Sequence, residues 1–310
     1  MDRKDFLKRA AMGAAGVVVG HSASAKTNPS SAQSISSASS GVGQESLTPI
    51  VSTYDRLMEQ VGFNHLPNTE VMTTQTVYHP ANSRGHANHG WLNSHHSFSF
   101  ANYRNPDRMH FGVLRVLNDD VVQGGKGFGA HPHDNMEIVS IPLDGDLEHQ
   151  DSMGNKTVIR QGDVQVMSAG TGVRHSEYNA SSSNPVKFLQ IWMFPNKRNV
   201  EPRYDQIKLE AQDNAITQIL SPSKDDAGVW AHQNAWWHVA KLDERNALTY
   251  ALNKPGQNGV YAFVLEGNAT IDGQALNPRD GFGIWDTNEI AIKATSNTRI
   301  LLMEVPMELS

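Results

Sequence analysis

From Tyr78 to its end, the chain consists of short runs of β-branched and aromatic residues, which Gly, Pro, Asn and Asp separate at regular intervals. Short strands with this spacing predict an all-β sandwich or barrel, whereas an α/β fold would alternate its strands with longer helical patterns. The runs with strand character are residues 111–117, 136–143, 157–159, 164–167, 187–194, 237–242, 260–265 and 290–294.

The two halves of this region show the same order of signals. One run in each half closes in Leu, an acidic residue and Gly, at 143–145 and at 265–267. In each half a second turn follows, and then a further run that begins near Gly162 or Gly281. A repeated order of elements indicates a repeated structural unit. We therefore predict two similar barrels, an N-terminal one at 75–200 and a C-terminal one at 201–310.

Two pairs of polar residues in the first half have the spacing of ligands on strands. His131 and His133 form one pair, and His175 and Glu177 form the other. Residues i and i+2 of a strand point to the same face, about 6.7 Å apart along the chain. If the two strands are neighbours, three imidazoles and one carboxylate converge inside one barrel. Such a set suits a transition metal better than Ca²⁺ or Mg²⁺.

Four protein ligands on an octahedral ion would leave two positions open, which is typical of a catalytic or sensing site rather than a structural one. The second barrel cannot repeat this site. Superposing Gly267 on Gly145 places Asn253 and Pro255 where the first half has its two leading histidines, and no histidine follows His238. We therefore expect one metal ion per chain and a C-terminal barrel without a metal site.

The histidine pair belongs to a longer pattern. His131, His133, Glu137 and Gly145 have the spacing of the first cupin motif, and the segment from Gly162 to Asn179 approximates the second. With these motifs, the sequence resembles the pirin family of bicupins, in particular the bacterial branch described as quercetin 2,3-dioxygenases. The matching segments are 84–92, 97–101, 131–133, 151–155, 162–165 and 167–170.

The resemblance implies two cupin barrels and iron as the usual metal, with other divalent transition metals possible. It places the ligands at His131, His133, His175 and Glu177, and so leaves Glu137 a structural or supporting role. It also implies an Fe²⁺-dependent dioxygenase that opens a flavonol such as quercetin with O₂, and we expect Glu177 to be the base for the substrate hydroxyl. The alternative is a non-catalytic regulator that senses metal or redox state and binds a protein partner.

Composition excludes several other classes. The formal net charge is −6, with 26 Lys and Arg against 32 Asp and Glu, so no basic field is available for a nucleic-acid backbone. The absence of cysteine excludes disulfides, thiol catalysis and iron–sulfur clusters. No apolar run reaches the roughly 18 residues that a membrane span requires.

The front of the chain has the features of a targeting segment. A basic start that includes Arg3 and Lys4 precedes a run of Ala, Gly and Val, and small residues at 23–25 offer a cleavage site. Residues 3–8 resemble a twin-arginine motif with lysine as the second basic residue. We expect 1–25 to be a signal that exports the protein to the periplasm. If the signal is not used, we expect the protein to stay in the cytoplasm. We expect 26–74 to hold a flexible Ser-rich tether and a short helix.

Other histidines and tryptophans of the body also have expected positions. His86, His89, His95 and His96 are expected in a polar loop near the first barrel, and His149 is expected to order a hairpin. The three tryptophans of the second half are expected between the barrels: Trp230, Trp236 and Trp237.

Overall fold

A computed structural model of the protein describes residues 73–309. In that range the chain forms twenty-two β-strands and two short 3₁₀ helices, η1 (Ala81–Ser83) and η2 (Pro106–Arg108), and no α-helix. The prediction of an all-β fold is confirmed. No helix in these residues is long and apolar enough to cross a membrane. The predicted export signal at 1–25 and nearly all of the predicted tether and helix at 26–74 lie outside the described residues.

The first barrel consists of a seven-stranded and a four-stranded sheet whose strands pair antiparallel. The large sheet has the order β12 (Arg203–Lys208), β9 (Asp163–Ser168), β6 (Glu137–Asp144), β11 (Val186–Met193), β4 (Leu114–Val122), β3 (Leu92–His96), β2 (Gly85–Asn88). The small sheet has the order β5 (Gly127–His133), β10 (Val173–Asn179), β7 (Leu147–Asp151), β8 (Lys156–Ile159).

The second barrel repeats this arrangement with seven and four strands, which confirms the predicted duplication. Its large sheet has the order β1 (Gln75–His79), β20 (Gly281–Trp285), β17 (Asn258–Glu266), β22 (Thr298–Pro306), β15 (Trp236–Leu242), β13 (Ala215–Ser221), β14 (Val229–Trp230). Its small sheet has the order β16 (Ala247–Ala251), β21 (Glu289–Ala294), β18 (Ala269–Ile271), β19 (Gln274–Leu276).

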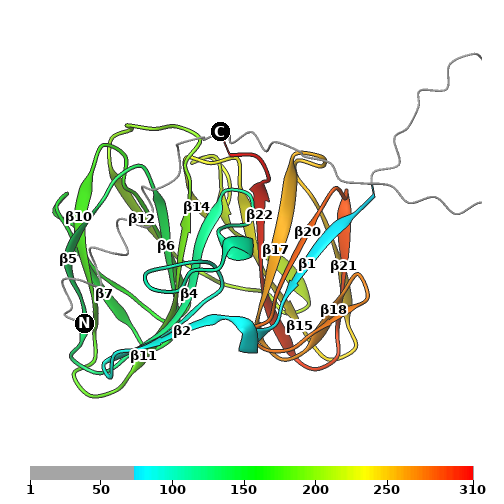
Figure 1. Cartoon of the computed structure of the whole chain (residues 1–310), viewed down its shortest axis with the longest axis horizontal. Coiled ribbons are helices and arrows are strands. Elements are labelled where there is room, and N and C mark those ends of the chain that lie inside the picture. Colours follow the sequence, from blue (N-terminus) through cyan, green and yellow to red (C-terminus); the bar gives the residue numbers. More distant parts are fainter. Residues whose placement is uncertain (1–72, 310) are drawn as a thin grey trace, which may run out of the picture. The chain divides into compact units, whose positions relative to one another are not determined.

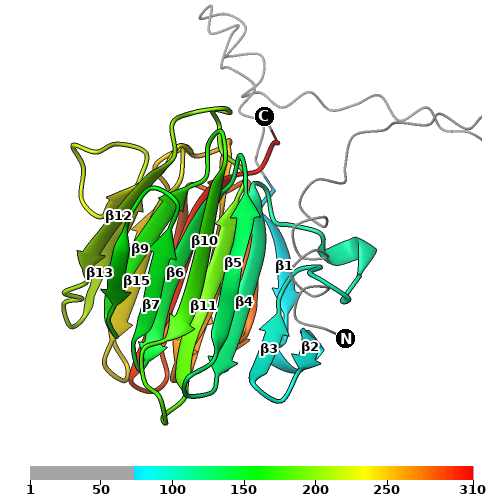
Figure 2. The same cartoon turned by 90° about the vertical axis from the view of Figure 1, so that its left-hand side faces the viewer.

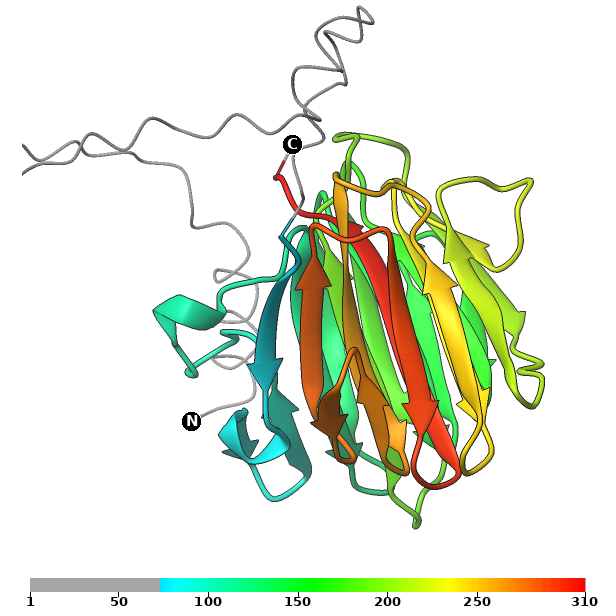
Figure 3. The same cartoon turned by 90° about the vertical axis from the view of Figure 1, so that its right-hand side faces the viewer.

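The two large sheets face each other and the small sheets lie on the outer sides (Figure 1). Figure 2 looks onto the green strands of the first barrel, and Figure 3 onto the yellow to red strands of the second. The main core lies between the large sheets and contains Leu189 and Ile191 of β11 together with Trp237 of β15. Because side chains alternate along a strand, the other face of β11 points into its own barrel. Trp237 thus occupies its expected position, whereas Trp230 and Trp236 are only half-buried.

The sheets do not divide at residue 200, where the sequence predicted the boundary. Strand β1 precedes the first barrel in the chain but pairs with β20 of the second, from Gln75 opposite Trp285 to His79 opposite Gly281. Strand β12 follows residue 200 but pairs with β9 of the first barrel. Each strand covers an edge that would otherwise expose unpaired backbone groups, which explains why the chain crosses the expected boundary.

The histidines expected in a polar loop lie instead in the hairpin of β2 and β3. His86 and His95 are paired across the two strands, and their rings stack with centroids 4.6 Å apart. His96 points the other way and is buried. The expectation of a loop was wrong because β2 and β3 pair with each other, and the short polar segment did not indicate that pairing.

A carboxylate ties the two barrels together. Asp119 of β4 accepts hydrogen bonds from Arg84 Nη1 at 3.1 Å and from Arg279 Nε at 3.0 Å, both on its Oδ2 atom. Arg279 lies just before β20 of the second barrel, in a left-handed backbone conformation with φ +70°. The ion pairs are largely shielded from water, with side-chain exposures of 13% for Asp119, 7% for Arg84 and 25% for Arg279.

Candidate metal centre

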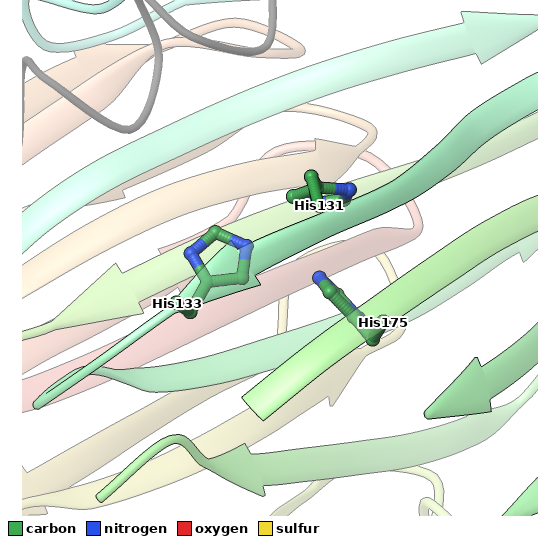
Figure 4. A group of neighbouring side chains, drawn as sticks. All are labelled: His131, His133 and His175. Carbon is green, nitrogen blue, oxygen red and sulfur yellow. The ribbon is translucent and has the colours of Figure 1, made fainter. Parts of the chain in front are cut away.

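Three imidazoles of the first barrel converge on one point. His131 and His133 stand at the end of β5, and His175 stands in β10, directly opposite His131. The ring centroids of His131 and His133 are 4.8 Å apart. The ring centroid of His175 lies 4.5 Å from that of His131 and 4.9 Å from that of His133. One nitrogen of each ring lies within 4.8 Å of the others. Figure 4 shows the three side chains on their strands. Strands β5 and β10 are neighbours, which is the condition that the sequence argument set for bringing these side chains together.

The position of β5 explains how a proline can stand between two ligands. Pro132 has no N–H to donate to a neighbouring strand, so proline is tolerated only where a sheet has a free edge. Strand β5 is the edge strand of its sheet, and Pro132 is exposed. His131 and His133 point to the opposite face, into the barrel.

The nitrogen atoms of these rings have the properties of metal donors. His131 Nδ1 donates to the Gly129 carbonyl at 2.8 Å, which leaves the lone pair on Nε2. His133 Nε2 and both ring nitrogens of His175 are buried and find no hydrogen-bond partner within residues 73–309. Buried polar atoms are normally paired because desolvation without a partner is unfavourable. A divalent transition metal would satisfy all three rings, so these residues fit the ion.

Burial also keeps the three rings in the form that binds metals. It lowers the pKa of each of them, that of His133 to about 3, with neighbouring positive charges adding to the effect. The imidazoles are therefore neutral near pH 7, with a lone pair available for a metal ion.

The predicted fourth ligand, Glu177, lies on the interior side of His175. Its Oε1 accepts from Ser140 Oγ at 2.8 Å and its Oε2 accepts from Gln190 Nε2 at 2.5 Å. Burial raises the pKa of this carboxyl, while His149 and the two hydrogen bonds act in the opposite direction. The potential ligand atoms of Glu177 group with those of His175 and His149, within 4.8 Å of one another.

His149 is the residue of this site that the sequence argument missed. As expected, it lies in a hairpin, that of β7 and β8, where it contacts Asp151 at the end of β7. It is also fully buried and lies directly opposite Glu177, which the sequence argument did not foresee. Its Nε2 is 2.9 Å from Asp151 Oδ2. The signal that could have found it is the spacing of His149 and Asp151, which is the same i, i+2 spacing as in the other two pairs.

Glu137 points away from the imidazoles. Its Oε2 accepts from Ser168 Oγ at 2.7 Å and from the backbone N–H of His232 at 3.2 Å. These bonds link the start of β6 to β9 and to the second half of the chain, as expected for a structural role.

An apolar wall borders the imidazoles on the other side. The Trp192 ring lies edge to face with His133, with centroids 4.9 Å apart, and Phe100 packs edge to face on Trp192 at 5.5 Å. A buried apolar cluster continues behind them: Val116, Met136, Ile138, Met167, Ala169 and Val173. The centre is thus polar toward Glu177 and aromatic toward Trp192, a combination that is typical of small-molecule sites.

Comparison with known proteins identifies the family. Residues 77–193 match the family model for pirin, and residues 218–305 match the model for the quercetinase C-terminal cupin domain. Quercetin 2,3-dioxygenase of Escherichia coli K12 is 46% identical over 229 residues, which cover 73% of this chain and 96% of that protein. The chain belongs to the pirin family. A pirin-like protein of Caulobacter vibrioides is 38% identical over 228 residues, 73% of this chain and 97% of that protein.

Solved structures agree with this assignment and with the two-cupin fold. Bacterial pirin YhhW from E. coli, in complex with nickel(II), superposes with a TM-score of 0.71 at 43% identity, over 75% of this chain and 99% of that one. The predicted family and fold are therefore confirmed. That structure contains nickel(II), so iron as the metal of this pirin stays a prediction.

The second cupin domain has a hydrogen-bonded asparagine at the position equivalent to His131. Asn253, predicted to stand where the first half has His131, donates from its Nδ2 to Glu304 Oε2 at 2.9 Å. Among the described residues, the clusters of three or more side chains that could hold a metal both lie in the first domain.

Proposed function

We propose that this pirin is a metal-dependent dioxygenase that opens a flavonol such as quercetin with O₂. His131, His133, His175 and Glu177 would hold the metal, with Fe²⁺ as the first candidate. The observation that carries the proposal is the convergence of three neutral imidazoles, two of them with buried unpartnered nitrogens among the described residues, beside an aromatic wall. The similarity to quercetin 2,3-dioxygenase supports the substrate class.

The bound ion would supply Lewis acidity and open positions for substrate and O₂. The protein would supply the base. Burial raises the pKa of Glu177, so its carboxylate is a better proton acceptor than an exposed one. Ser140 and Gln190 hold the two oxygens in place, so that a proton taken from the substrate hydroxyl would arrive at a fixed position.

The aromatic side of the site would orient the substrate. A flavonol is planar and apolar apart from its hydroxyl and carbonyl groups, so its rings would pack against Trp192 and Phe100. The same contacts would keep water away from the reacting ring. The polar edge of the substrate would then face Glu177 and the imidazoles.

The test uses metal-free protein reloaded with Fe²⁺ or with Ni²⁺ and supplied with quercetin in air. We expect loss of the flavonol absorbance with uptake of one O₂ for each quercetin, and no reaction by the metal-free protein. The variant His86→Ala, which changes an exposed histidine of the β2–β3 hairpin, is the matched control and should react normally. If neither metal supports quercetin loss, the dioxygenase proposal fails and the alternative, a metal- or redox-sensing regulator, is favoured.

We also propose that residues 1–25 direct export through the twin-arginine route. The basic start, the apolar run and the small residues at 23–25 support this. N-terminal sequencing of protein from a periplasmic fraction should show cleavage after about residue 25. A variant with Arg3→Gln and Lys4→Gln should stay uncleaved in the cytoplasm. Identical location and length of the two proteins would contradict the proposal.

A further inference from the structure

Strand β10, which carries His175 and Glu177, has ligand-type residues on both neighbouring strands. On one side His131 of β5 lies opposite His175. On the other side β7 presents Asp151 opposite His175 and His149 opposite Glu177. The first side supplies two imidazoles, His131 and His133, which form the three-imidazole group with His175 of β10. The second side supplies a further imidazole, deeper in the barrel.

His149 is held in a defined orientation and tautomer. Its Nε2 faces Asp151 Oδ2 at 2.9 Å, and because a carboxylate oxygen only accepts, Nε2 carries the hydrogen of this bond. Asp151 is itself fixed by the backbone N–H groups of Met153 and Asn155 and by the side-chain amide of Asn155, at 2.8–3.1 Å. The ring nitrogen of His149 that can face a metal ion is therefore Nδ1. That atom is buried and has no hydrogen-bond partner in the described part of the chain.

We propose that His149, His175 and Glu177 form a second position for the metal ion, next to the position of the three imidazoles. One ion occupies either position. His175 and Glu177 belong to the four ligands proposed above and are common to both positions, and His149 is the ligand that only the inner position has. The inference rests on the proposed metal site but not on the dioxygenase reaction.

The donor chemistry of this inner position suits a divalent transition metal. Two imidazoles and one carboxylate, with other coordination positions open, form a set that such metals bind in many proteins. Potential ligand atoms of all three residues lie within 4.8 Å of one another. His149, His175 and Glu177 are buried, with exposures of 0%, 2% and 2%, so the carboxylate charge would be matched by the ion rather than by water.

The experiment removes the outer position and asks whether binding survives. In full-length protein with His131→Ala and His133→Ala, we expect one equivalent of Ni²⁺ to bind by calorimetric titration, roughly 100-fold more weakly than in the wild type. Adding His149→Gln to this variant should weaken binding at least roughly tenfold further. His149→Gln alone should keep one equivalent, because the three imidazoles remain. With Co²⁺, the visible absorption spectrum of the double variant should differ from that of the wild type.

Several results would overturn the inference. One is that the double variant binds no Ni²⁺ although it keeps the circular dichroism and cooperative melting of the wild type. Another is that adding His149→Gln leaves the Ni²⁺ affinity of the double variant unchanged. A third is that the wild type binds two equivalents of Ni²⁺. If the alanine pair does not fold, His131→Gln with His133→Gln removes the same donors with polar side chains and is read in the same way. Failure of the quercetin assay leaves these outcomes unaffected, whereas a wild-type chain that binds no divalent metal would overturn the proposed metal site as well.

Discussion

His175 of β10 lies directly opposite His131 of β5, with their ring centroids 4.5 Å apart. The two residues are distant in sequence, and antiparallel pairing at the edge of the four-stranded sheet brings them together. His175 also borders His149 and Glu177 on its other side. It is therefore the residue common to both groups of potential metal ligands among the described residues.

The first prediction concerns His175. The variant His175→Ala should lower Ni²⁺ affinity more than any other single substitution at the centre, by at least roughly 100-fold. In the wild type, free Ni²⁺ at 100 times its dissociation constant should raise the free energy of unfolding by about 2.7 kcal/mol. This stabilisation should appear in thermal melting as a higher Tm with Ni²⁺ than without it. We expect the higher Tm for the wild type and for His86→Ala, and not for His175→Ala. Equal increases in all three proteins would contradict the role of His175.

The second prediction separates the two buried glutamates of the first domain. Glu177→Gln should abolish quercetin turnover, because the amide cannot accept the substrate proton, and it should weaken metal binding roughly 10–100-fold. Glu137→Gln has the same change in charge and shape, but Glu137 bonds to Ser168 and to the backbone of His232. Its turnover should therefore persist. Full activity of Glu177→Gln under saturating metal would remove that residue as the base.

The third prediction concerns pH and His238, which lies in the second domain away from the metal centre. Burial lowers the pKa of His238 to about 4. An unfolded histidine takes up a proton below about pH 6.5, whereas the folded one does so only near pH 4, so acid favours the unfolded chain. This residue should reduce the free energy of unfolding by up to about 1.4 kcal/mol per pH unit as pH falls from 6.5 to 4, and should have little effect above 6.5.

Urea unfolding at pH 7, 6 and 5 measures this effect. The variant His238→Gln should have a shallower loss of stability with acid than the wild type. His110→Gln, at an exposed position, should keep the wild-type slope. Parallel curves for His238→Gln and the wild type would show that the ring is accessible to protons in the folded state.

The fourth prediction concerns the carboxylate between the domains. Asp119→Ala should lower the free energy of unfolding by about 2 kcal/mol, because Arg84 and Arg279 lose a shielded partner. Asp144→Ala removes an ion pair with Lys187 in which both side chains are about half exposed, and should cost less than about 1 kcal/mol. Guanidinium unfolding of both variants makes the comparison. Equal losses would indicate that the Asp119 ion pairs do not stabilise the contact between the domains.

The sequence by itself determined the strand content of this protein, its internal repeat and the face of each strand on which side chains lie. The spacing of strand-like runs and turns was enough for an all-β fold, and their repeated order was enough for two similar barrels. The i, i+2 spacing placed His131 and His133 on one face, and His175 and Glu177 on another, because alternation along a strand is a property of the backbone alone. Motif spacing identified the pirin family on the same residues.

Only the tertiary structure decided which strands are neighbours and in what register. Register depends on hydrogen bonds and packing between segments far apart in the chain, so it leaves no mark in local sequence. The spacing of His149 and Asp151 was visible in the sequence, but the position of His149 opposite Glu177 was not. For the same reason, β1 and β12 crossed the expected boundary to cover sheet edges. The same pairing gave the centre its two sides, with Trp192 on one and the β7 histidine on the other.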